Sequence, residues 1–470
     1  MDNGEGVAVI APQKEKKEKK SDKKPKKMHI ALFFDGTLNN RFNIEAREHN
    51  TEDYQDNTES GSSFENGRTN IAIMESHIEE TAKGYDFFKS EYIEGQGTFN
   101  LEGDSFWGYA LAIGDSGVPS RAEQGVDKAM TAILAFEDFE KDLHYIEKLT
   151  IDVFGFSRGA ATARYAIHLL LKDEDKLFNR LQKFGYEVEE SVIEVGFAGL
   201  YDTVLSYLAS QKFKSSNNRL EQKAIKYAKK AVHLASADEH RKDFPLHNIK
   251  GAKCKGGEEY FLPGVHSDVG GSYNTADEEK IKSKEDSRNE EYEDDIVYSV
   301  KNSEKMLINK GKPEEIEQDR KNLIEQGWYT EDEIKIEIKY RRRRRGGSVI
   351  NRREAYALLK VNRTGIESAY SNIPLKIMAE FARGEHANLT INSKLEDRAN
   401  KIIEKAELTD FETRIKGYVA GTSNSKPEDW LDDLSLKEIR HKHFNFSARV
   451  GIGYAPRIKD GKRTRFIYDA

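Results

Sequence analysis

The segment around Ser157 constrains the fold of this chain more than any other part of its sequence. An apolar run at residues 149–154 leads into Gly155–Gly159, of sequence GFSRG, and a stretch of mostly small residues at 160–166 follows directly. This order predicts a strand, a tight turn and a helix, the arrangement of a nucleophile elbow with its serine hydroxyl on a strained turn. Glycines at the flanking positions let the strand and helix backbones approach closely. The alternative is an ordinary Gly-Ser-Gly turn between a strand and a helix.

Short apolar runs recur elsewhere in the chain, and each of them ends in a polar or glycine-containing loop. Residues 70–83 and 121–147 have the periodicity of amphipathic helices, whereas the polar residues 41–69 predict a loop. Strands that alternate with helices indicate an α/β fold with a mostly parallel sheet and helices on both faces. The expected strands are residues 28–34, 87–93, 149–154, 192–199 and 259–263.

The N-terminal region is unusually basic. Lysine occupies nine of the fourteen positions from Lys14 to Lys27, and such a block is typical of a solvated, disordered tail. We therefore expect residues 1–27 to be a tail, with contact to acidic lipid headgroups or an acidic partner as the alternative. The α/β core is expected to follow at residues 28–275.

The next region changes composition. Residues 276–347 are rich in Glu, Lys, Asp and Arg and contain few large apolar residues, which predicts a charged insertion or cap. Within it, the five consecutive arginines Arg341–Arg345 are interpreted as a solvated loop. Residues 348–470 are expected to complete the core or cap, with a helix that begins near Ile373 and a strand-and-turn region at 450–468.

Composition excludes several classes of protein. The net charge of −7 gives no general reason to expect a nucleic-acid partner. No run of about 18 apolar residues predicts a membrane span, and the N-terminus lacks the apolar stretch and cleavage site of a Sec-type signal peptide. The lone Cys254 rules out an internal disulfide framework. The expected chemistry needs neither a metal nor a cofactor.

A serine nucleophile needs a base, and the base needs a carboxylate that orients it. In α/β-hydrolases these residues follow in the order Ser, Asp or Glu, His. Asp202 follows the strand expected at 192–199, and His266 follows the one at 259–263 in a glycine-rich loop. Both therefore lie at carboxyl ends of strands, where an open α/β sheet forms its site. Asp268 is the alternative orienting carboxylate, or it fixes the loop through backbone amides.

Structural roles remain open for these residues, since Asp202 also suits a turn or helix cap and His266 a loop position. Other histidines compete as the base, although none follows a strand into a glycine-rich turn so plainly. They are His233, His240, His247, His441 and His443.

A serine hydrolase also needs backbone N–H groups that hold the oxyanion. One is expected at Arg158, directly after the nucleophile, and the other in a loop at the end of a neighbouring strand. The loop Asp35-Gly36-Thr37 follows the strand at 28–34, and Gly36 lets a substrate oxygen approach the backbone. The alternatives are a plain turn and a phosphoryl-transferring Asp35, which would leave the serine turn and the histidine loop unexplained.

Four motifs in this order resemble those of the α/β-hydrolase family that includes type VI secretion lipase effectors of the first class. The resemblance covers roughly residues 28–275, with weaker matches at 373–379 and 455–463. The four motifs are Phe34–Asn40, Gly155–Ala161, Leu200–Val204 and Pro263–Gly271.

The resemblance implies that Ser157, Asp202 and His266 form a triad that hydrolyses acyl esters of glycerophospholipids. It implies an antibacterial phospholipase, made in the bacterial cytoplasm, delivered without a Sec signal and active in the periplasm of a target cell. A secretion spike protein and an immunity protein would be its partners. The chain departs from the family at Leu38 and Ser272, where glycine is common, and both changes lie at the rim of the site.

Two other functions remain compatible with the sequence. One is an inactive, hydrolase-shaped cargo or adaptor protein of a secretion spike. The other is a soluble carboxylesterase that acts on small esters and never meets a membrane.

Overall fold

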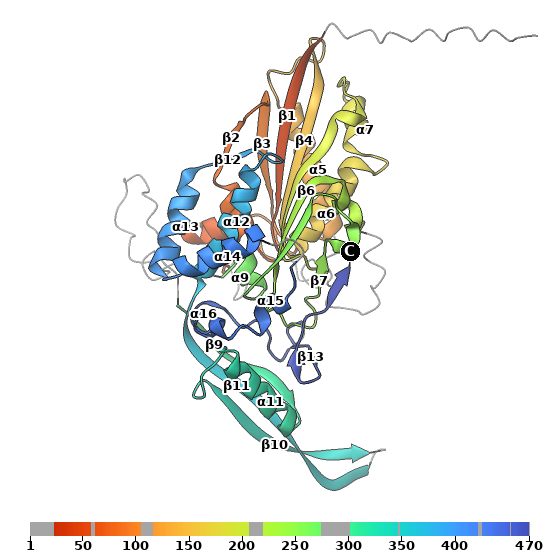
Figure 1. Cartoon of the computed structure of the whole chain (residues 1–470). Helices are drawn as coiled ribbons and strands as arrows, with labels where there is room; N and C mark the ends of the chain where they lie inside the picture. Colours follow the sequence, from red (N-terminus) through yellow and green to blue (C-terminus); the bar gives the residue numbers. More distant parts are fainter. Residues whose placement is uncertain are drawn as a thin grey trace, which may run out of the picture.

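A six-stranded parallel sheet forms the centre of the fold (Figure 1). Every neighbouring pair of its strands is parallel, so the predicted α/β fold with a parallel sheet is confirmed. All five expected strands are present, and a sixth, β6, is one that the sequence analysis missed. In spatial order the strands are β3 (Phe87–Ile93), β1 (Lys24–Phe34), β4 (His144–Phe156), β5 (Ile193–Tyr201), β6 (Ala228–Ser236) and β8 (Gly257–Leu262).

The computed structural model describes residues 23–57, 62–104, 116–205, 220–273, 301–345, 348–421, 425–451 and 453–469. Most of the expected N-terminal tail lies outside these ranges. The boundary expected at residue 27 is wrong, because Lys24–Lys27 belong to β1 and pair with the first residues of β4. Their side chains still reach the surface, where Lys27 lies 3.5 Å from Glu147. Backbone pairing, rather than burial of side chains, therefore places these lysines in the sheet.

Helices cover both faces of the sheet, as alternation along β1 requires. Ile30, Leu32 and Phe34 pack with α5 (Val118–Leu134) and α6 (Arg158–Leu171). Ala31 and Phe33 point to the opposite face, which α3 (Asn70–Glu75) and α12 (Asn372–Arg383) cover. Because successive side chains of a strand point to opposite faces, a strand buried on both sides has a continuous apolar sequence.

The helices near the N-terminus differ from the expected ones. The predicted loop 41–69 contains α1 (Arg41–Glu48) and α2 (Glu52–Asn57). The side chain of Asn40 accepts from Phe42 N and caps α1, which explains a helix in so polar a stretch. The helix predicted at 70–83 is α3 followed by β2 (Ile78–Ala82). The helix predicted at 121–147 ends at Leu134, and β4 begins at His144.

The described part of the charged insertion, residues 301–345, is largely β-sheet. Its strands β9 (Lys301–Gly311), β10 (Ile334–Arg345) and β11 (Ser348–Glu367) are antiparallel, with α11 (Pro313–Glu325) between the first two. They form an arm at the lower end of the molecule in Figure 1. The boundary expected at 347 is wrong, because it falls between two paired strands. The interpretation of Arg341–Arg345 as a loop is also wrong, since these residues end β10.

The C-terminal region packs back onto the core. The helix expected near Ile373 lies within α12, and the last strand, β15 (Ile467–Asp469), pairs with β7 (Leu246–Asn248). Within the described residues, no helix is both long and apolar enough to cross a membrane.

The remaining elements are α7 (Leu177–Lys183), α9 (His266–Gly270), β12 (Leu389–Ile391), α13 (Ser393–Lys405), α14 (Thr409–Gly421), α15 (Glu428–Leu431), α16 (Lys437–His443), β13 (Ile458–Lys459), β14 (Lys462–Arg463) and the short 3-10 turns at Glu190–Val192, Gln222–Tyr227, Lys250–Ala252, Ser368–Ser371 and Leu434–Leu436.

Candidate active site

Ser157 lies on a strained turn between β4 and α6, so the predicted strand–turn–helix is present. Its backbone has φ 59° and ψ −125°, a conformation that costs energy in a residue other than glycine. Gly155 and Gly159 allow the backbone to turn tightly from β4 into α6. A Cβ on Gly155 would lie 2.6 Å from Ala160 Cα, and one on Gly159 would lie 2.2 Å from Asp35 O. The two glycines therefore let the helix begin directly against the end of β1.

We expect Gly159→Ala to lower the free energy of unfolding by about 1–3 kcal/mol, because the added methyl group overpacks against the backbone of Asp35. The shift of the denaturant midpoint at constant slope measures this loss. Gly417→Ala is a matched control on the exposed face of α14, where a Cβ meets nothing within 4 Å. It should raise stability by about 0.5–1 kcal/mol. Equal midpoints for Gly159→Ala and the wild type would contradict the close packing at the turn.

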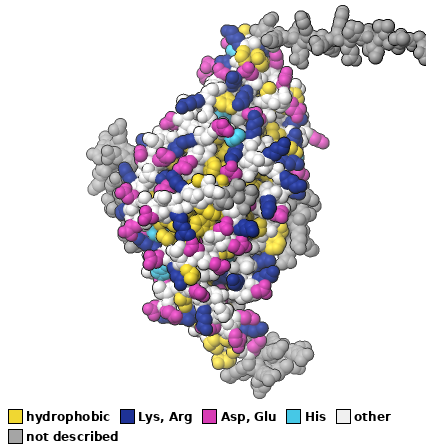
Figure 2. Space-filling view, viewed as in Figure 1, with side chains coloured by type: hydrophobic (Ala, Val, Ile, Leu, Met, Phe, Trp, Pro, Cys, Tyr) yellow, Lys and Arg dark blue, Asp and Glu magenta, His cyan; other side chains and the backbone are white. Residues whose placement is uncertain are grey.

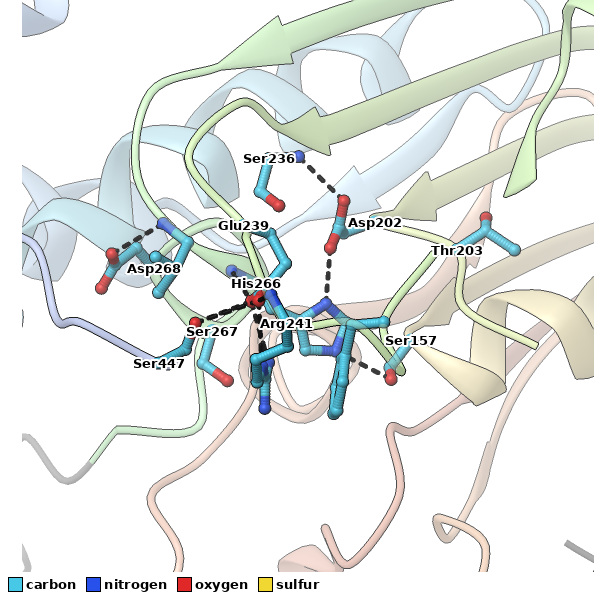
Figure 3. A network of polar contacts seen from close by, with 12 residues as sticks. Ser157, Asp202, Thr203, Ser236, Glu239, Arg241, His266, Ser267, Asp268 and Ser447 are labelled. Atoms are coloured by element: carbon cyan, nitrogen blue, oxygen red, sulfur yellow. Dashed lines mark hydrogen bonds and ion pairs between the residues drawn. The ribbon is translucent and has the colours of Figure 1, made fainter. Parts of the chain in front are cut away.

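Ser157, His266 and Asp202 form one chain of hydrogen bonds (Figure 3). His266 Nε2 lies 2.8 Å from Ser157 Oγ, and His266 Nδ1 lies 2.5 Å from Asp202 Oδ2. Ser157 follows β4, Asp202 follows β5 and His266 follows β8, so the parallel sheet brings the three residues together at the carboxyl ends of its strands. All three side chains are buried. The structure thus joins the three residues that the sequence analysis selected, in the order of nucleophile, base and orienting acid.

The carboxylate of Asp202 receives four donors. Besides His266, they are Ser236 N at 2.9 Å and two guanidinium nitrogens of Arg465, Nη1 at 2.6 Å and Nη2 at 2.9 Å. Burial would raise the pKa of Asp202, but Arg465 and His266 together hold it well below its usual range. These contacts therefore favour the ionised form of Asp202.

His266 is held as a neutral base. Burial lowers the pKa of His266, although Asp202 acts in the opposite direction. The imidazole ring lies between two aromatic rings, 4.6 Å from the centroid of Phe156 and 5.2 Å from that of Phe244. A neutral imidazole bonded to an anion through Nδ1 presents Nε2 to the serine as a proton acceptor.

A second ion pair lies beside the histidine loop. Glu239 binds Arg241 through two hydrogen bonds from the guanidinium, at 3.0 and 2.9 Å, and also accepts from Ser447 Oγ. Burial would raise the pKa of Glu239, but Arg241 lowers it to about 2. Arg241 in turn covers the ring of Phe244, with its guanidinium 3.3 Å from the ring centroid. The Glu239–Arg241 pair therefore supports Phe244, one of the two aromatic rings beside His266.

Asp268, the alternative orienting acid, makes other contacts. Its carboxylate accepts from Val265 N at 2.9 Å and from Asn445 Nδ2 at 3.0 Å. Burial raises the pKa of Asp268 to about 7. His266 Nδ1 bonds to Asp202 and not to Asp268, so the contacts of Asp268 fit the second role considered for it, which is to fix the loop that carries His266.

The loop after β1 lies against the nucleophile turn, as expected for an oxyanion loop. Thr37 Oγ1 accepts from Arg158 Nε at 2.5 Å. Within this loop the Gly36 N–H donates to Asp35 Oδ1 at 2.6 Å. The N–H groups of Asp35, Leu38 and Asn39 are engaged as well. Within the described part of the chain, Thr37 N–H is the remaining donor of this loop.

Asp35 is unsuited to be a nucleophile. Its carboxylate is buried and accepts from Tyr92 Oη at 2.6 Å, Thr69 Oγ1 at 2.7 Å and Gly36 N. Burial raises its pKa to about 6, although these hydrogen bonds lower it. The phosphoryl-transfer alternative needs an exposed, ionised aspartate, so the structure favours Asp35 as the residue that holds the shape of the loop.

The competing histidines lie in other surroundings. His233 is buried between Glu259 and the backbone of Thr203. Burial lowers the pKa of His240 and of His247 to about 3, and that of His443 to about 4. His441 binds Glu333 at 2.8 Å. None of these contacts is with Ser157.

The two departures from the family pattern share one backbone property. Leu38 has φ 57° and Ser272 has φ 91°, so both occupy the region that favours glycine. The backbone shape that glycine would allow is therefore kept with a larger residue. Leu38 N donates to Gln96 O, and Ser272 N donates to Arg68 O, which holds both turns in place.

Sequence reasoning missed two parts of the site. Strand β6 ends at Ser236 and delivers Glu239 and Arg241, and its apolar run followed by a polar loop is the same signal that identified the other strands. Arg465 had no comparable signal, because it is one of several arginines in the basic segment 457–465. The described residues contain no cluster of His, Cys, Asp and Glu suited to a metal ion.

Comparison with known proteins links this geometry to one family. Residues 171–288 match the family model described as "T6SS, Phospholipase effector Tle1-like, catalytic domain", where T6SS denotes type VI secretion. The matched segment contains Asp202 and His266, whereas Ser157 precedes it. No curated protein matches. The resemblance carried by the four sequence motifs is confirmed by this match.

Solved structures extend the comparison to nearly the whole chain. The fold is similar to that in "Structure of the Tle1 effector bound to the VgrG spike from the Type 6 secretion system", over 98% of each chain, with a TM-score of 0.59 and 18% identity. A crystal structure of an uncharacterized protein from Pseudomonas aeruginosa covers 53% of this chain and 42% of its own, at 20% identity and a TM-score of 0.31. The latter likeness is too low to support an argument, and the former supports the fold.

Proposed function

We propose that this chain is a serine phospholipase that hydrolyses acyl esters of membrane glycerophospholipids. The observation that carries the proposal is the hydrogen-bonded chain Ser157–His266–Asp202 at the carboxyl edge of a parallel sheet. An adaptor protein has no need of a serine on a strained turn, bonded to a histidine that is itself bonded to a buried anion. An active enzyme is therefore the better explanation.

The reaction is acyl transfer in two steps. Ser157 Oγ attacks the ester carbonyl while His266 Nε2 takes its proton, and the proton then passes to the leaving alcohol as the ester C–O bond breaks. Water, deprotonated by His266, attacks the acyl-enzyme, and fatty acid leaves with Ser157 restored. Asp202 stabilises the imidazolium in both steps.

The backbone N–H groups of Arg158 and Thr37 would hold the oxyanion of each tetrahedral intermediate. Arg158 is the first residue of α6, so the positive end of the helix dipole faces the same point. Removing one such donor typically costs on the order of 2.7–4 kcal/mol of transition-state stabilisation. The bond from Arg158 Nε to Thr37 Oγ1 fixes the two segments relative to each other.

The phospholipid substrate is proposed because of the family match at residues 171–288. A comparison of substrates tests it: the wild type should release fatty acid from phospholipid vesicles and accelerate when a phospholipid passes from monomer to micelle. A small-ester carboxylesterase would instead hydrolyse short soluble esters with no such acceleration. Vesicles with different acyl chains at sn-1 and sn-2 then assign the A1 or A2 type from the fatty acid released.

Delivery by type VI secretion is part of the proposal. The similar solved structure is of an effector bound to a VgrG spike, and we propose a spike protein as the partner of this chain, an immunity protein as its inhibitor, and the periplasm of a target cell as its place of action. Co-purification with a spike protein of the same bacterium tests the first of these.

Lysines and arginines are interspersed with acidic residues on the face in Figure 2, which gives no broad basic surface there for nucleic acid.

A further inference from the structure

Arg465 binds both oxygens of the acid of the proposed triad. Its Nη1 lies 2.6 Å from Asp202 Oδ1 and its Nη2 lies 2.9 Å from Asp202 Oδ2, which is the two-pronged geometry that suits a guanidinium and a carboxylate. The side chain of Arg465 is only 3% exposed, and that of Asp202 is fully buried. Such a pair is strong in geometry and costly to break.

The guanidinium of Arg465 makes further hydrogen bonds around the site. Nε donates to Phe244 O at 2.9 Å, and Nη1 also donates to Ser236 Oγ at 2.9 Å. Phe244 contacts the ring of His266, and Ser236 N donates to Asp202. Arg465 therefore bonds to Asp202, to Ser236 at the end of β6 and to the backbone of Phe244, whose ring contacts His266. Its own segment is held by the pairing of β15 with β7.

We propose that Arg465 is a positioning residue of the active site, which holds Asp202 charged and correctly oriented toward His266. This inference rests on the proposed function, because it assigns a role within the same triad. The segment around β14 and β15 is then a structural part of the site, although it lies 263 residues after Asp202 in the chain.

The charges around the triad support this assignment. Glu239 and Arg241, from the loop after β6, face His266 but neutralise each other. Asp268, on the same short helix as His266, binds Asn445 and Val265 N. Arg465 is thus the cation that directly balances Asp202. Without Arg465, burial would still raise the pKa of Asp202, but the charge that most lowers this pKa would be gone. The Asp202–His266 pair would then bind a proton more readily.

Charge and geometry can be separated with two variants and one control. Arg465→Met removes both the charge and the two-pronged contact with Asp202, whereas Arg465→Lys keeps the charge but loses the two-pronged contact. Arg463→Met is the matched control: Arg463 lies two residues earlier, is also buried and binds Asp319 through two hydrogen bonds at 2.9 and 2.8 Å. Within the described residues, that pair makes no hydrogen bond or ion pair with the triad.

We expect Arg465→Met to lower kcat/KM about 10- to 100-fold at its pH optimum, the rate equivalent of one or two charge-assisted hydrogen bonds. The acidic limb of its pH profile should also move to higher pH, so that the loss grows as the pH falls. Arg465→Lys should keep the limb close to the wild-type position while kcat falls. Arg463→Met should lower the unfolding midpoint and leave the pH profile superimposed on that of the wild type.

A profile of Arg465→Met that superimposes on the wild type, with a loss of stability like that of Arg463→Met, would overturn the proposal and leave Arg465 a purely structural residue. The second readout needs no turnover: the NMR signal of the proton between His266 Nδ1 and Asp202 should titrate at higher pH in Arg465→Met. An unchanged titration would overturn the proposal as well. If the wild type has no esterase activity but this titration shifts, the proposed function fails while the role of Arg465 stands.

Discussion

Replacing Ser157 with alanine should lower the release of fatty acid from phospholipid vesicles by about 10⁶-fold, the loss seen when a triad serine is removed. The variant keeps the oxyanion donors but has no atom that can form the acyl-enzyme. His266 Nε2 also loses its hydrogen-bond partner at 2.8 Å. Lipid-product analysis of the wild type beside Ser157→Ala measures the effect directly.

Two controls make this result specific to the nucleophile. A fluorophosphonate probe should label the wild type and not Ser157→Ala, which separates an enzyme from an inactive adaptor with the same fold. Ser267→Ala removes a hydroxyl next to His266 that accepts from Ser272 Oγ, and it should keep activity within a few-fold of the wild type. Full fatty-acid release by a well-folded Ser157→Ala would refute the proposed mechanism.

The second large effect is expected for Asp202→Asn, which should lower kcat about 10⁴-fold through the wrong imidazole tautomer. The amide is neutral and cannot stabilise the imidazolium, and one of its two heavy atoms is a donor where His266 and Arg465 both need acceptors. The loss should appear in kcat rather than in KM, because the interaction strengthens only as charge develops on His266. Steady-state kinetics on micellar phospholipid measures it.

Asp202→Asn should also lower stability by about 3–5 kcal/mol, because it leaves the buried guanidinium of Arg465 without a counter-charge. The pKa of Asp202 is depressed in the folded state, so its contribution to stability is present above the unperturbed value of 3.8 and is lost only as the pH falls below it. Asp319→Asn breaks the similar pair with Arg463. It should cost comparable stability and leave kcat unchanged, whereas an equal loss of kcat in both variants would assign the effect to folding.

The sequence could predict the parts of this fold that local patterns encode. Strands buried on both faces have largely continuous apolar sequences, so β1, β4 and β5 were recognisable, and the order of polar loops after the predicted strands led to Ser157, Asp202 and His266. The arm was not recognisable by apolarity. In β10, Ile334, Ile336 and Ile338 alternate with charged residues, a two-residue period that the overall charge of the region obscured.

Long-range partners could not be predicted in this way. Nothing local distinguishes Arg465 from Arg463, and yet one binds the acid of the site and the other binds Asp319. The sequence placed an oxyanion donor in the loop after β1 without saying which N–H group it is, and the side chain of Asp35 folds back and accepts from Gly36 N. Such contacts depend on the approach of distant segments or on side-chain conformation, and a single sequence records neither.

The pairing of Asp202 with Arg465 has a consequence for the order of events during synthesis. The two residues are separated by 263 positions, which a ribosome translating about 5–20 residues per second covers in roughly 13 to 53 s. Once His266 has been made, 64 residues after Asp202, the nascent chain holds its serine, its histidine and an acid that lacks its counter-ion until Arg465 follows. The charge balance of the site is therefore complete only after Arg465 has been made.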